Sequence, residues 1–273
     1  MKIKKNNVFY NGYSQHKISE LLKLGRTKNY SAPELAKVFN CSKSTILRAL
    51  DYNNIHLPNK GQFKRKYNLN DNFFDKLDNI SAYWLGFIAA DGCILNKTNG
   101  IKIVLSNIDD NHLRKFLKAI NSNGKIHYVK KYNSVFVEIY SKKIVKRLLS
   151  YGITPKKSLS IKHVKVPSFL MSHFIRGIFD GDGSITGKKR THLQFMIAGN
   201  KPFLEQIQDV LIKRCYLNKV KIYPLKSKAF KIQYTGIQFF KILNFIYKNS
   251  ESSIMLDRKY EKYLYYKKVF NMT

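Results

Sequence analysis

The chain has 273 residues, of which 50 are Lys or Arg and only 17 are Asp or Glu, so its formal net charge is +33. Because 44% of the residues are hydrophobic and 14% are aromatic, this charge belongs to a folded body rather than to a disordered basic tail. The composition therefore predicts a globular protein that binds a polyanion.

The cysteines and the apolar segments exclude other classes of protein. Cys41, Cys93 and Cys215 lie far apart and form no CxxC pair, which argues against a zinc finger and against a disulfide framework. No apolar stretch reaches the ~20 residues that a membrane span requires, and no apolar segment follows the basic N-terminus. We therefore expect a soluble cytoplasmic protein, bacterial, phage-encoded or organellar, that is not secreted and has no membrane partner.

The first predicted elements are two helices, Ala32–Phe39 and Lys43–Asn53, within residues 1–56. Ser31 and Ser42 precede them as N-caps, and a short turn separates them. This pattern predicts a helix-turn-helix DNA-binding domain, although a plain helical hairpin has similar apolar spacing and stays open as the alternative. The side chains that would face a major groove are Lys43, Ser44, Thr45 and Arg48.

Residues 57–79 are predicted to be a basic linker. They contain Pro58, Gly61 and several lysines, and they show little hydrophobic periodicity. Such a segment could follow a phosphate backbone.

The remainder of the chain contains an internal repeat. The segment SAYWLGFIAADGCI (Ser81–Ile94) recurs as HFIRGIFDGDGSI (His173–Ile185), and their terminal acids, Asp91 and Asp182, stand 91 residues apart. A period of this length is typical of a duplicated small domain rather than of a solenoid. We set the two repeats at residues 80–165 and 166–273.

The predicted elements follow each motif in the same order. In the first repeat they are a strand, a helix, two strands and a helix, at Ile101–Ser106, Asn111–Ile120, Lys125–Tyr132, Val135–Tyr140 and Lys142–Leu149. In the second repeat they are Leu193–Ala198, Pro202–Ile212, Lys219–Tyr223, Lys228–Tyr234 and Ile237–Tyr247, with a final helix at Ile254–Lys267. We assign each repeat the order α-β-β-α-β-β-α, in which the strand directly after the motif helix is given no range of its own, and this order predicts an α+β fold plus the small all-α N-terminal domain.

Small residues in the two motifs predict a close helix pair. Gly86 and Ala90 lie on one helix face, and Gly177 and Gly181 lie on the corresponding face of the other helix. Each helix then ends in Asp-Gly, with the glycine expected to form the C-terminal turn. The two helices should therefore form the interface between the repeats and bring the two aspartates together.

A carboxylate at the negative end of a helix is unfavourable, and two carboxylates side by side also repel each other. The arrangement therefore favours a divalent cation between Asp91 and Asp182, with the preceding Ala90 and Gly181 grouped with them as metal-site residues. A few hard oxygen ligands indicate Mg²⁺. For a single copy, a simple Asp-Gly helix end would be the better interpretation, whereas two copies in so basic a protein favour the metal site.

The segments WLGFIAADG (Trp84–Gly92) and IRGIFDGDG (Ile175–Gly183) resemble the LAGLIDADG motif of homing endonucleases, and two copies resemble the single-chain, two-motif type. The resemblance implies a pseudo-twofold duplicated fold with saddle-shaped antiparallel sheets, and a monomer with an internal pseudo-dimer. It also implies intron homing through Mg²⁺-dependent hydrolysis of both strands of a long asymmetric double-stranded DNA site, leaving short 3′ overhangs. One departure from the motif is that Asp180 has only Ala89 as its counterpart, so we interpret Asp180 as a local hydrogen-bonding residue.

The resemblance further implies a basic residue from each repeat near the scissile phosphate and a polar residue that positions water. The matching segments offer Lys156 or Lys157 and Lys248 for the first role, and Asn107 and Asn200 for the second. We take Lys157 and Lys248 as the catalytic candidates beside the two aspartates.

The antiparallel sheets are expected to read DNA in the major groove. In the first repeat the candidates are Asn96, Lys97, Lys102, Lys130 and Tyr132. In the second repeat they are Lys188, Arg190, His192, Gln194, Lys221, Lys228, Lys231 and Gln233.

Two other functions share this fold. One is an intron maturase, whose partner would be intron RNA, and the other is a DNA-binding regulator that does not cleave. The presence of both aspartates favours cleavage. The chain lacks the Cys or Ser start and the His-Asn finish typical of inteins, so we expect a free-standing protein.

Overall fold

The computed structural model describes residues 14–27, 30–57, 67–155, 160–187, 189, 192–226, 229–248, 250 and 254–270. It divides the chain into two compact units, residues 1–66 and 67–273. Each unit has a hydrophobic core of its own, and the two sequence repeats share the second unit.

The first unit contains three helices in its described residues, α2 (Gln15–Thr27), α3 (Ala32–Val38) and α4 (Lys43–Asp51). The predicted caps are present, because the Ser42 hydroxyl accepts a hydrogen bond from the backbone N–H of Thr45 at 3.1 Å and Ser31 forms a capping box. The sequence prediction missed α2, although its buried residues stand at helical spacing. Leu21, Leu35 and Ile46 are fully buried where the three helices pack.

The first repeat begins with the motif helix and continues through four strands and two further helices. These are α5 (Asn79–Asp91), β1 (Gly92–Leu95), β2 (Gly100–Ser106), α6 (Asp110–Ala119), β3 (His127–Val129), β4 (Ser134–Tyr140) and α7 (Lys142–Tyr151). Short 3₁₀ turns, η1 (Asn96–Thr98), η2 (Asn107–Asp109) and η3 (Lys130–Tyr132), connect them.

The second repeat has the same order of elements. After η4 (Ser168–Leu170) come α9 (Met171–Asp182), β5 (Gly183–Thr186), β6 (Gln194–Gly199), α10 (Lys201–Cys215), β7 (Tyr223–Pro224), β8 (Phe230–Thr235) and α11 (Ile237–Tyr247). One additional helix, α12 (Asp257–Val269), ends the described chain. The predicted α-β-β-α-β-β-α order and the α+β class are confirmed.

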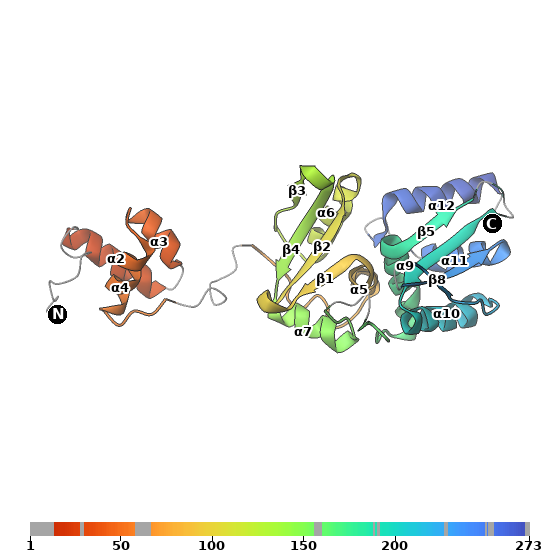
Figure 1. Ribbon diagram of the computed structural model, residues 1–273, viewed down its shortest axis with the longest axis horizontal. Helices are drawn as coiled ribbons and strands as arrows, with labels where there is room; N and C mark the ends of the chain where they lie inside the picture. The colour runs from red at the N-terminus through yellow and green to blue at the C-terminus, as the bar shows by residue number, and fades with distance from the viewer. Residues whose placement is uncertain are drawn as a thin grey trace. The chain divides into compact units, whose positions relative to one another are not determined.

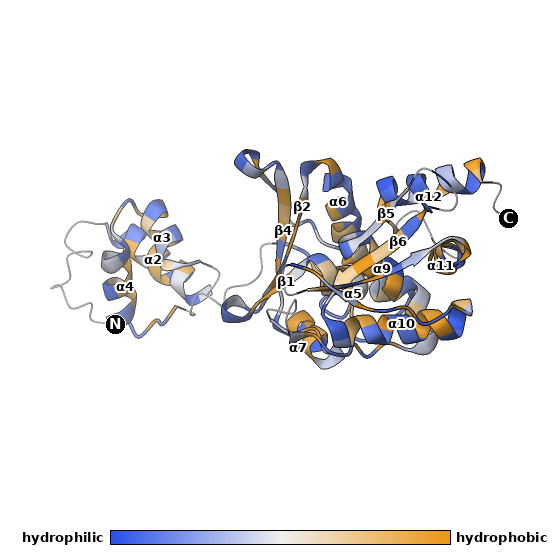
Figure 2. Cartoon of the chain, turned by 45° about the vertical axis from the view of Figure 1, so that its right-hand side comes forward, coloured by the Kyte–Doolittle hydropathy of each residue, from blue (hydrophilic) through white to orange (hydrophobic). Residues whose placement is uncertain are grey.

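Each repeat contributes one four-stranded antiparallel sheet, and the strand orders correspond, β1-β2-β4-β3 and β5-β6-β8-β7. Burial alternates along the central strands, so that Ile103 and Val137 face the core while their neighbours Lys102 and Glu138 face outward. Figure 2 shows this alternation as mixed hydropathy along the strands. Each sheet therefore packs one face on helices and leaves the other face open.

The helices α5 and α9 lie side by side at the centre of the second unit, with one sheet on either side (Figure 1). Their backbones are in contact: a β-carbon on Gly86 would stand 2.0 Å from the carbonyl oxygen of Phe174, and one on Gly177 would stand 2.0 Å from that of Tyr83. Near the helix ends, a β-carbon on Gly181 would stand 2.4 Å from the β-carbon of Ala90. The predicted role of these small residues is confirmed.

The glycines that follow the two aspartates correct one prediction. Gly92 and Gly183 do not form left-handed turns; their φ angles of −76° and −91° are extended, and each begins the next strand. Glycine is needed there for space, because a β-carbon on Gly92 would lie 2.7 Å from the carbonyl oxygen of Ile88. The chain therefore passes directly from each aspartate into a sheet.

Two predicted edge strands are wrong in extent. The strand predicted at Lys125–Tyr132 is limited to β3 and is followed by η3, with Asn133 in the left-handed conformation. The strand predicted at Lys219–Tyr223 is limited to β7, because the carbonyl of Val220 accepts a hydrogen bond from the Gln208 side chain and Pro224 has no N–H to donate. A segment at the edge of a sheet can alternate between hydrophobic and polar residues without forming hydrogen bonds to a neighbouring strand, so the alternation predicted strands that are too long.

We predict that Gly86→Ala and Gly177→Ala each destabilise the protein strongly, because the new methyl group would overlap the partner helix backbone. The loss should be at or above the ~3 kcal/mol upper end typical of overpacking. Chemical denaturation measures it. Gly199→Ala, where the nearest atom lies 3.4 Å from the added carbon, is the matched control and should change the free energy of unfolding little.

Candidate functional site

The two motif aspartates stand at the last positions of α5 and α9, where the helices remain in contact. The side chain of Asp91 is half-buried, and its Oδ2 lies 3.2 Å from the position of a β-carbon on Gly181. Asp182 is exposed. The side chain of Asp91 thus lies against the end of the other repeat's helix.

Both carboxylates act on one ammonium group, that of Lys259 in α12. Lys259 is 7% exposed, and its Nζ donates to the backbone carbonyls of Phe179 at 2.6 Å, Asp180 at 2.8 Å, Gly181 at 3.4 Å and Gly183 at 2.6 Å. Burial lowers the pKa of Lys259 to about 8, against the opposing effect of the charges of Asp180, Asp91 and Asp182. A cation here also complements the negative end of α9.

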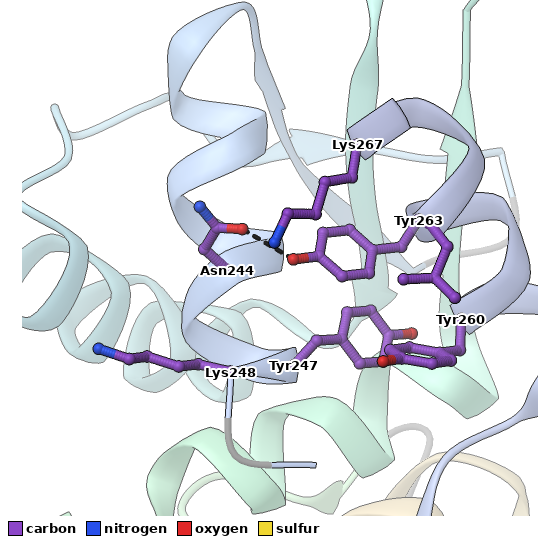
Figure 3. Close-up of a pocket in the computed structure, with 7 residues that line it drawn as sticks. Asn244, Tyr247, Lys248, Tyr260, Tyr263 and Lys267 are labelled. Atoms are coloured by element: carbon purple, nitrogen blue, oxygen red, sulfur yellow. Dashed lines mark hydrogen bonds between the residues drawn. The ribbon is translucent and has the colours of Figure 1, made fainter. Parts of the chain in front are cut away.

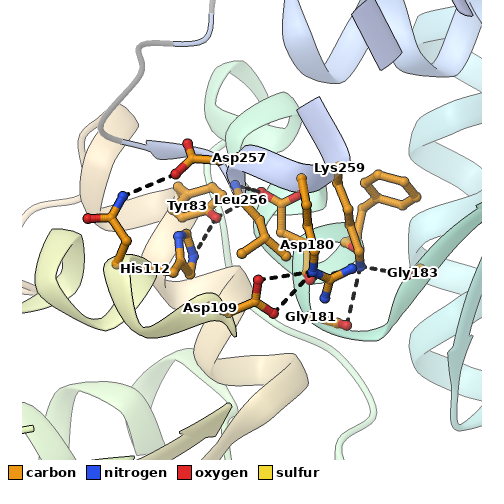
Figure 4. A network of polar contacts seen from close by, with 12 residues as sticks. Tyr83, Asp109, His112, Asp180, Gly181, Gly183, Leu256, Asp257 and Lys259 are labelled. Atoms are coloured by element: carbon orange, nitrogen blue, oxygen red, sulfur yellow. Dashed lines mark hydrogen bonds and ion pairs between the residues drawn. The ribbon is translucent and has the colours of Figure 1, made fainter. Parts of the chain in front are cut away.

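The first turn of α12 is held by the first repeat. Arg258 Nε donates to both carboxylate oxygens of Asp109, at 3.0 and 3.1 Å, and Lys115 pairs with Asp257. Lys115 also donates to the carbonyl of Met255 at 3.1 Å. Figure 4 shows the contact of Asp109 with α12 beside the contacts of Lys259. The helix that delivers Lys259 to α9 is therefore anchored on both repeats.

Asp180 lies in a buried hydrogen-bond network beside this site (Figure 4). Its carboxylate accepts from the hydroxyls of Tyr83 and Tyr247, at 2.8 and 3.2 Å, and from the backbone N–H of Leu256 at 2.8 Å. Burial raises the pKa of Asp180, while Lys259 and these donors oppose the shift. The prediction that Asp180 is a hydrogen-bonding residue is confirmed.

His112 extends the network from α5 to α6. Its Nε2 lies 2.9 Å from the hydroxyl of Tyr83, and its ring packs against Trp84 and Phe87. Burial lowers the pKa of His112 to about 3. The histidine is therefore neutral and structural, and the network couples α6, α5 and α9.

The residues fit a magnesium ion that keeps much of its water. Among the described residues there is no group of three or more His, Cys, Asp or Glu side chains that could hold a metal ion. Two carboxylates with hard oxygen donors meet the requirement of Mg²⁺, which is commonly bound by one or two carboxylates, water and substrate phosphate. The carbonyl of Gly181 already accepts a hydrogen bond from Lys259.

Of the basic residues predicted near the scissile phosphate, the structure describes Lys248, whereas Lys156 and Lys157 lie outside the described residues. Lys248 ends α11 and lines a cavity of about 480 Å³ between α11 and α12, whose lining includes neither Asp91 nor Asp182. Figure 3 shows its side chain directed away from the tyrosines of this cavity. The lysine that does reach the pair, Lys259, was missed because nothing in the sequence separates it from its many neighbouring lysines.

The predicted water-positioning residues have other contacts. Asn200 caps α10, since its Oδ1 accepts from the backbone N–H of Phe203 at 3.1 Å, and its amide donates to the carbonyl of Ile161. Asn107 lies in η2, and its backbone N–H donates to the carbonyl of Asn133 at 2.9 Å.

The open face of the second sheet is polar. Register places Gln194 beside Thr235, and Gln233 beside Met196, on this face, where Lys231 donates to Gln233 at 3.2 Å. The open face of the first sheet is different, because Lys102 pairs with Glu138 at 2.9 Å and lies over the ring of Phe136. The two open faces therefore present different chemistry.

The other predicted DNA-contacting residues lie on turns and in the first unit. The exposed residues among them are Lys43, Ser44, Arg48, Asn96, Lys97, Lys130, Tyr132, His192 and Lys221, whereas Thr45 is half-exposed. The hydroxyls of Ser44 and Thr45 each lie 2.8 Å from that of Ser42 within the helix cap. Lys156, Lys157, Lys188, Arg190 and Lys228 lie outside the described residues.

None of the helices in the described part of the chain combines the length and the apolar character needed to cross a membrane.

A comparison with family models matches residues 78–151 to the LAGLIDADG-like domain, which confirms the resemblance for the first repeat. Over 203 residues, 66% of this chain, the sequence is 27% identical to the "Probable translation initiation factor IF-2" of Methanocaldococcus jannaschii. The match spans only 16% of that protein's length.

Three solved structures are also similar. The N-terminal LAGLIDADG domain of DUF199/WhiA is 19% identical, with a TM-score of 0.45, covering 67% of this chain and 91% of that one. The homing endonuclease I-LtrWI bound to target DNA is 16% identical, with a TM-score of 0.47, covering 74% and 91%. Variants of the homing endonuclease I-DmoI are 18% identical, with a TM-score of 0.45, covering 63% and 97%. Likenesses of this size do not carry the activities of those proteins over to this chain.

We predict that acid destabilises the protein through its two buried histidines. Burial lowers the pKa of His112 to about 3 and that of His173 to about 4, below the ordinary 6.5. Between those values and 6.5 the unfolded chain binds protons that the folded chain does not, so the free energy of unfolding falls as pH decreases.

Urea unfolding at pH 7 and pH 5 tests this prediction. His112→Gln should reduce the difference in unfolding free energy between the two pH values by on the order of 2 kcal/mol. His192→Gln, at an exposed position, should leave that difference unchanged. If His112→Gln leaves the difference in unfolding free energy between pH 7 and pH 5 unaltered, His112 takes up protons equally in the folded and the unfolded chain, and the prediction is wrong.

Proposed function

We propose that this chain, in which residues 78–151 form a LAGLIDADG-like domain, is a Mg²⁺-dependent endonuclease that cuts both strands of a specific double-stranded DNA site. The observation that carries the proposal is the pair of motif helices in backbone contact, each ending in an aspartate, with both aspartates acting on the same ammonium group.

The proposed metal ligands are Asp91 and Asp182. Their positions at abutting helix ends concentrate negative charge where two helix dipoles also point, so a divalent cation is strongly favoured there. When bound, Mg²⁺ would activate water for attack on the phosphodiester and stabilise the leaving 3′ oxygen. The aspartates hold and orient the ion, and the rigid α5 and α9 contact fixes their separation.

The proposed DNA-binding surface consists of the open faces of the two sheets. A net charge of +33 supports binding to a polyanion, and an antiparallel sheet face can enter a major groove. Because β1 and β5 begin at the residues after the aspartates, each sheet leads away from the cutting site. The difference between the two open faces supports an asymmetric target.

The first unit is proposed to add a further DNA contact through α4. Its exposed Lys43 and Arg48 lie on a helix whose N-terminus is capped, and helix N-termini favour phosphate. In this proposal the unit enlarges the target site and takes no part in cleavage.

We predict that Asp91→Asn and Asp182→Asn each abolish double-strand cleavage while changing DNA affinity little, because both variants keep the sheet faces intact. The assay is cleavage of a randomised double-stranded DNA library in Mg²⁺, with sequencing of the cut ends, which should carry short 3′ overhangs.

Asp209→Asn is the matched control for this experiment. It removes the same charge from an exposed site on α10 and should cut at the wild-type rate. Normal cutting by either motif variant would remove that aspartate from the mechanism. Intact DNA under all conditions, with tight binding of intron RNA instead, would contradict the nuclease and favour a maturase.

We also predict that Lys231→Gln weakens DNA binding and reduces the slope of log affinity against log salt concentration by about 1, as expected for one lost phosphate contact. Lys201→Gln is the control, since Lys201 is an exposed lysine on α10, a helix that packs on the buried face of the same sheet. Equal effects of the two substitutions would indicate that DNA does not bind to the open face of the second sheet. Fluorescence anisotropy over a range of salt concentrations measures both.

A further inference from the structure

The C-terminal helix α12 places a buried lysine at the end of α9. Lys259 is the only lysine among the buried polar and charged residues of the described chain, and its ammonium is surrounded by four backbone carbonyls of α9 and β5. Removing an ammonium group from water is costly unless its charge is compensated. The carbonyl dipoles at the helix end supply part of that compensation.

The negative charges of nearby carboxylates supply the rest of the compensation for the buried ammonium group. Asp180 is buried beside Lys259. Asp182 lies between Gly181 and Gly183, whose carbonyls both accept from the ammonium, and Asp91 Oδ2 lies 3.2 Å from the β-carbon position of Gly181. The charges of Asp91 and Asp182 therefore act on the same ammonium. Arg258, the adjacent cation on α12, is instead engaged by Asp109. Lys259 is therefore the cation shared by the carboxylates of both motifs.

Contacts with both repeats fix the position of α12 and therefore the position of the ammonium group. Lys115 and Asp109 hold its first turn from the first repeat, and Lys262 and Tyr266 donate to the carbonyls of Ile185 and Gly187 in the second. A side chain anchored in this way loses little further entropy when it binds its partners.

We propose that Lys259 is a positioning residue that acts as a built-in counter-ion for Asp91 and Asp182 at neutral pH, allowing the two carboxylates to lie together before any divalent cation binds. The proposal rests on the proposed function in treating these two aspartates as the metal ligands. The ammonium offsets the mutual repulsion of two carboxylates at abutting helix ends.

The counter-ion role predicts a coupling between Lys259 and the aspartates. Lys259→Met removes the hydrogen bonds to carbonyls and the attraction to all three carboxylates, whereas in an Asp91→Asn, Asp182→Asn background it removes only the hydrogen bonds and the attraction to Asp180. The substitution should therefore cost less stability in the double-Asn background. Lys259→Gln keeps an N–H donor without the charge and serves as a second variant if the methionine variant fails to fold.

The experiment is chemical denaturation of the full chain in EDTA, for both Lys259 variants in both backgrounds. Lys262→Met is the matched control, because Lys262 lies one turn along α12 and donates to a single backbone carbonyl at 2.8 Å. Its cost should be equal in the two backgrounds. Equal costs for the Lys259 variants as well would overturn the proposal and leave Lys259 as a cap of α9.

A second measurement uses Mg²⁺ alone, without DNA. If Mg²⁺ can take the place of the ammonium charge, it should raise the denaturation midpoint of Lys259→Gln by more than that of the wild type, and only when both aspartates are present. An equal shift in the two proteins would contradict the proposal.

The two proposals can fail separately. If Lys259 is coupled to the aspartates but the protein never cuts DNA, the counter-ion proposal stands and the nuclease proposal fails. If cleavage depends on the aspartates but Lys259 is not coupled to them, the nuclease proposal stands and the counter-ion proposal fails.

Discussion

The contact between the backbones of α5 and α9 determines the rest of the second unit. Gly86 and Gly177 each lie where a β-carbon would overlap a carbonyl of the opposite helix, so the helices are as close as backbones can come. This closeness joins the two repeats around a shared hydrophobic core and fixes how far apart the helix ends can be. The aspartates at those ends, and the sheets that begin after them, take their positions from it.

Bringing the helix ends together has an electrostatic consequence. Two negative dipole ends and two carboxylates meet in a small volume, and a third carboxylate, Asp180, is buried beside them. The structure offsets this with hydrogen bonds from Tyr83 and Tyr247 to Asp180 and with the ammonium of Lys259. The polar network is therefore part of the packing between repeats, and it extends through His112 to α6.

Duplication has given the two halves the same architecture and different surfaces. The strand orders and connections correspond, yet the open face of one sheet carries Lys102, Glu138 and Phe136 in mutual contact, and that of the other carries Gln194, Lys231 and Gln233. Core-facing positions must fit the same packing in both repeats, whereas outward positions are free to differ. A protein built in this way can bind a pseudo-symmetric ligand, such as a DNA duplex, through two halves that present different side chains.

The sequence by itself determined the repeat, the order of elements and the tight helix pair, because hydrophobic periodicity and small residues at helical spacing act locally and are visible in the chain. It also identified Asp91 and Asp182, since both stand within the repeated motif. Only the tertiary structure decided which lysine reaches them. Lys248 was selected by matching its segment to the family, but it lines a cavity whose lining includes neither aspartate. Lys259 lies on α12, a helix that has no counterpart among the described elements of the first repeat. The extent of the edge strands and the extended backbone of Gly92 and Gly183 were likewise decided by contacts between distant segments, which the order of residues along the chain does not reveal.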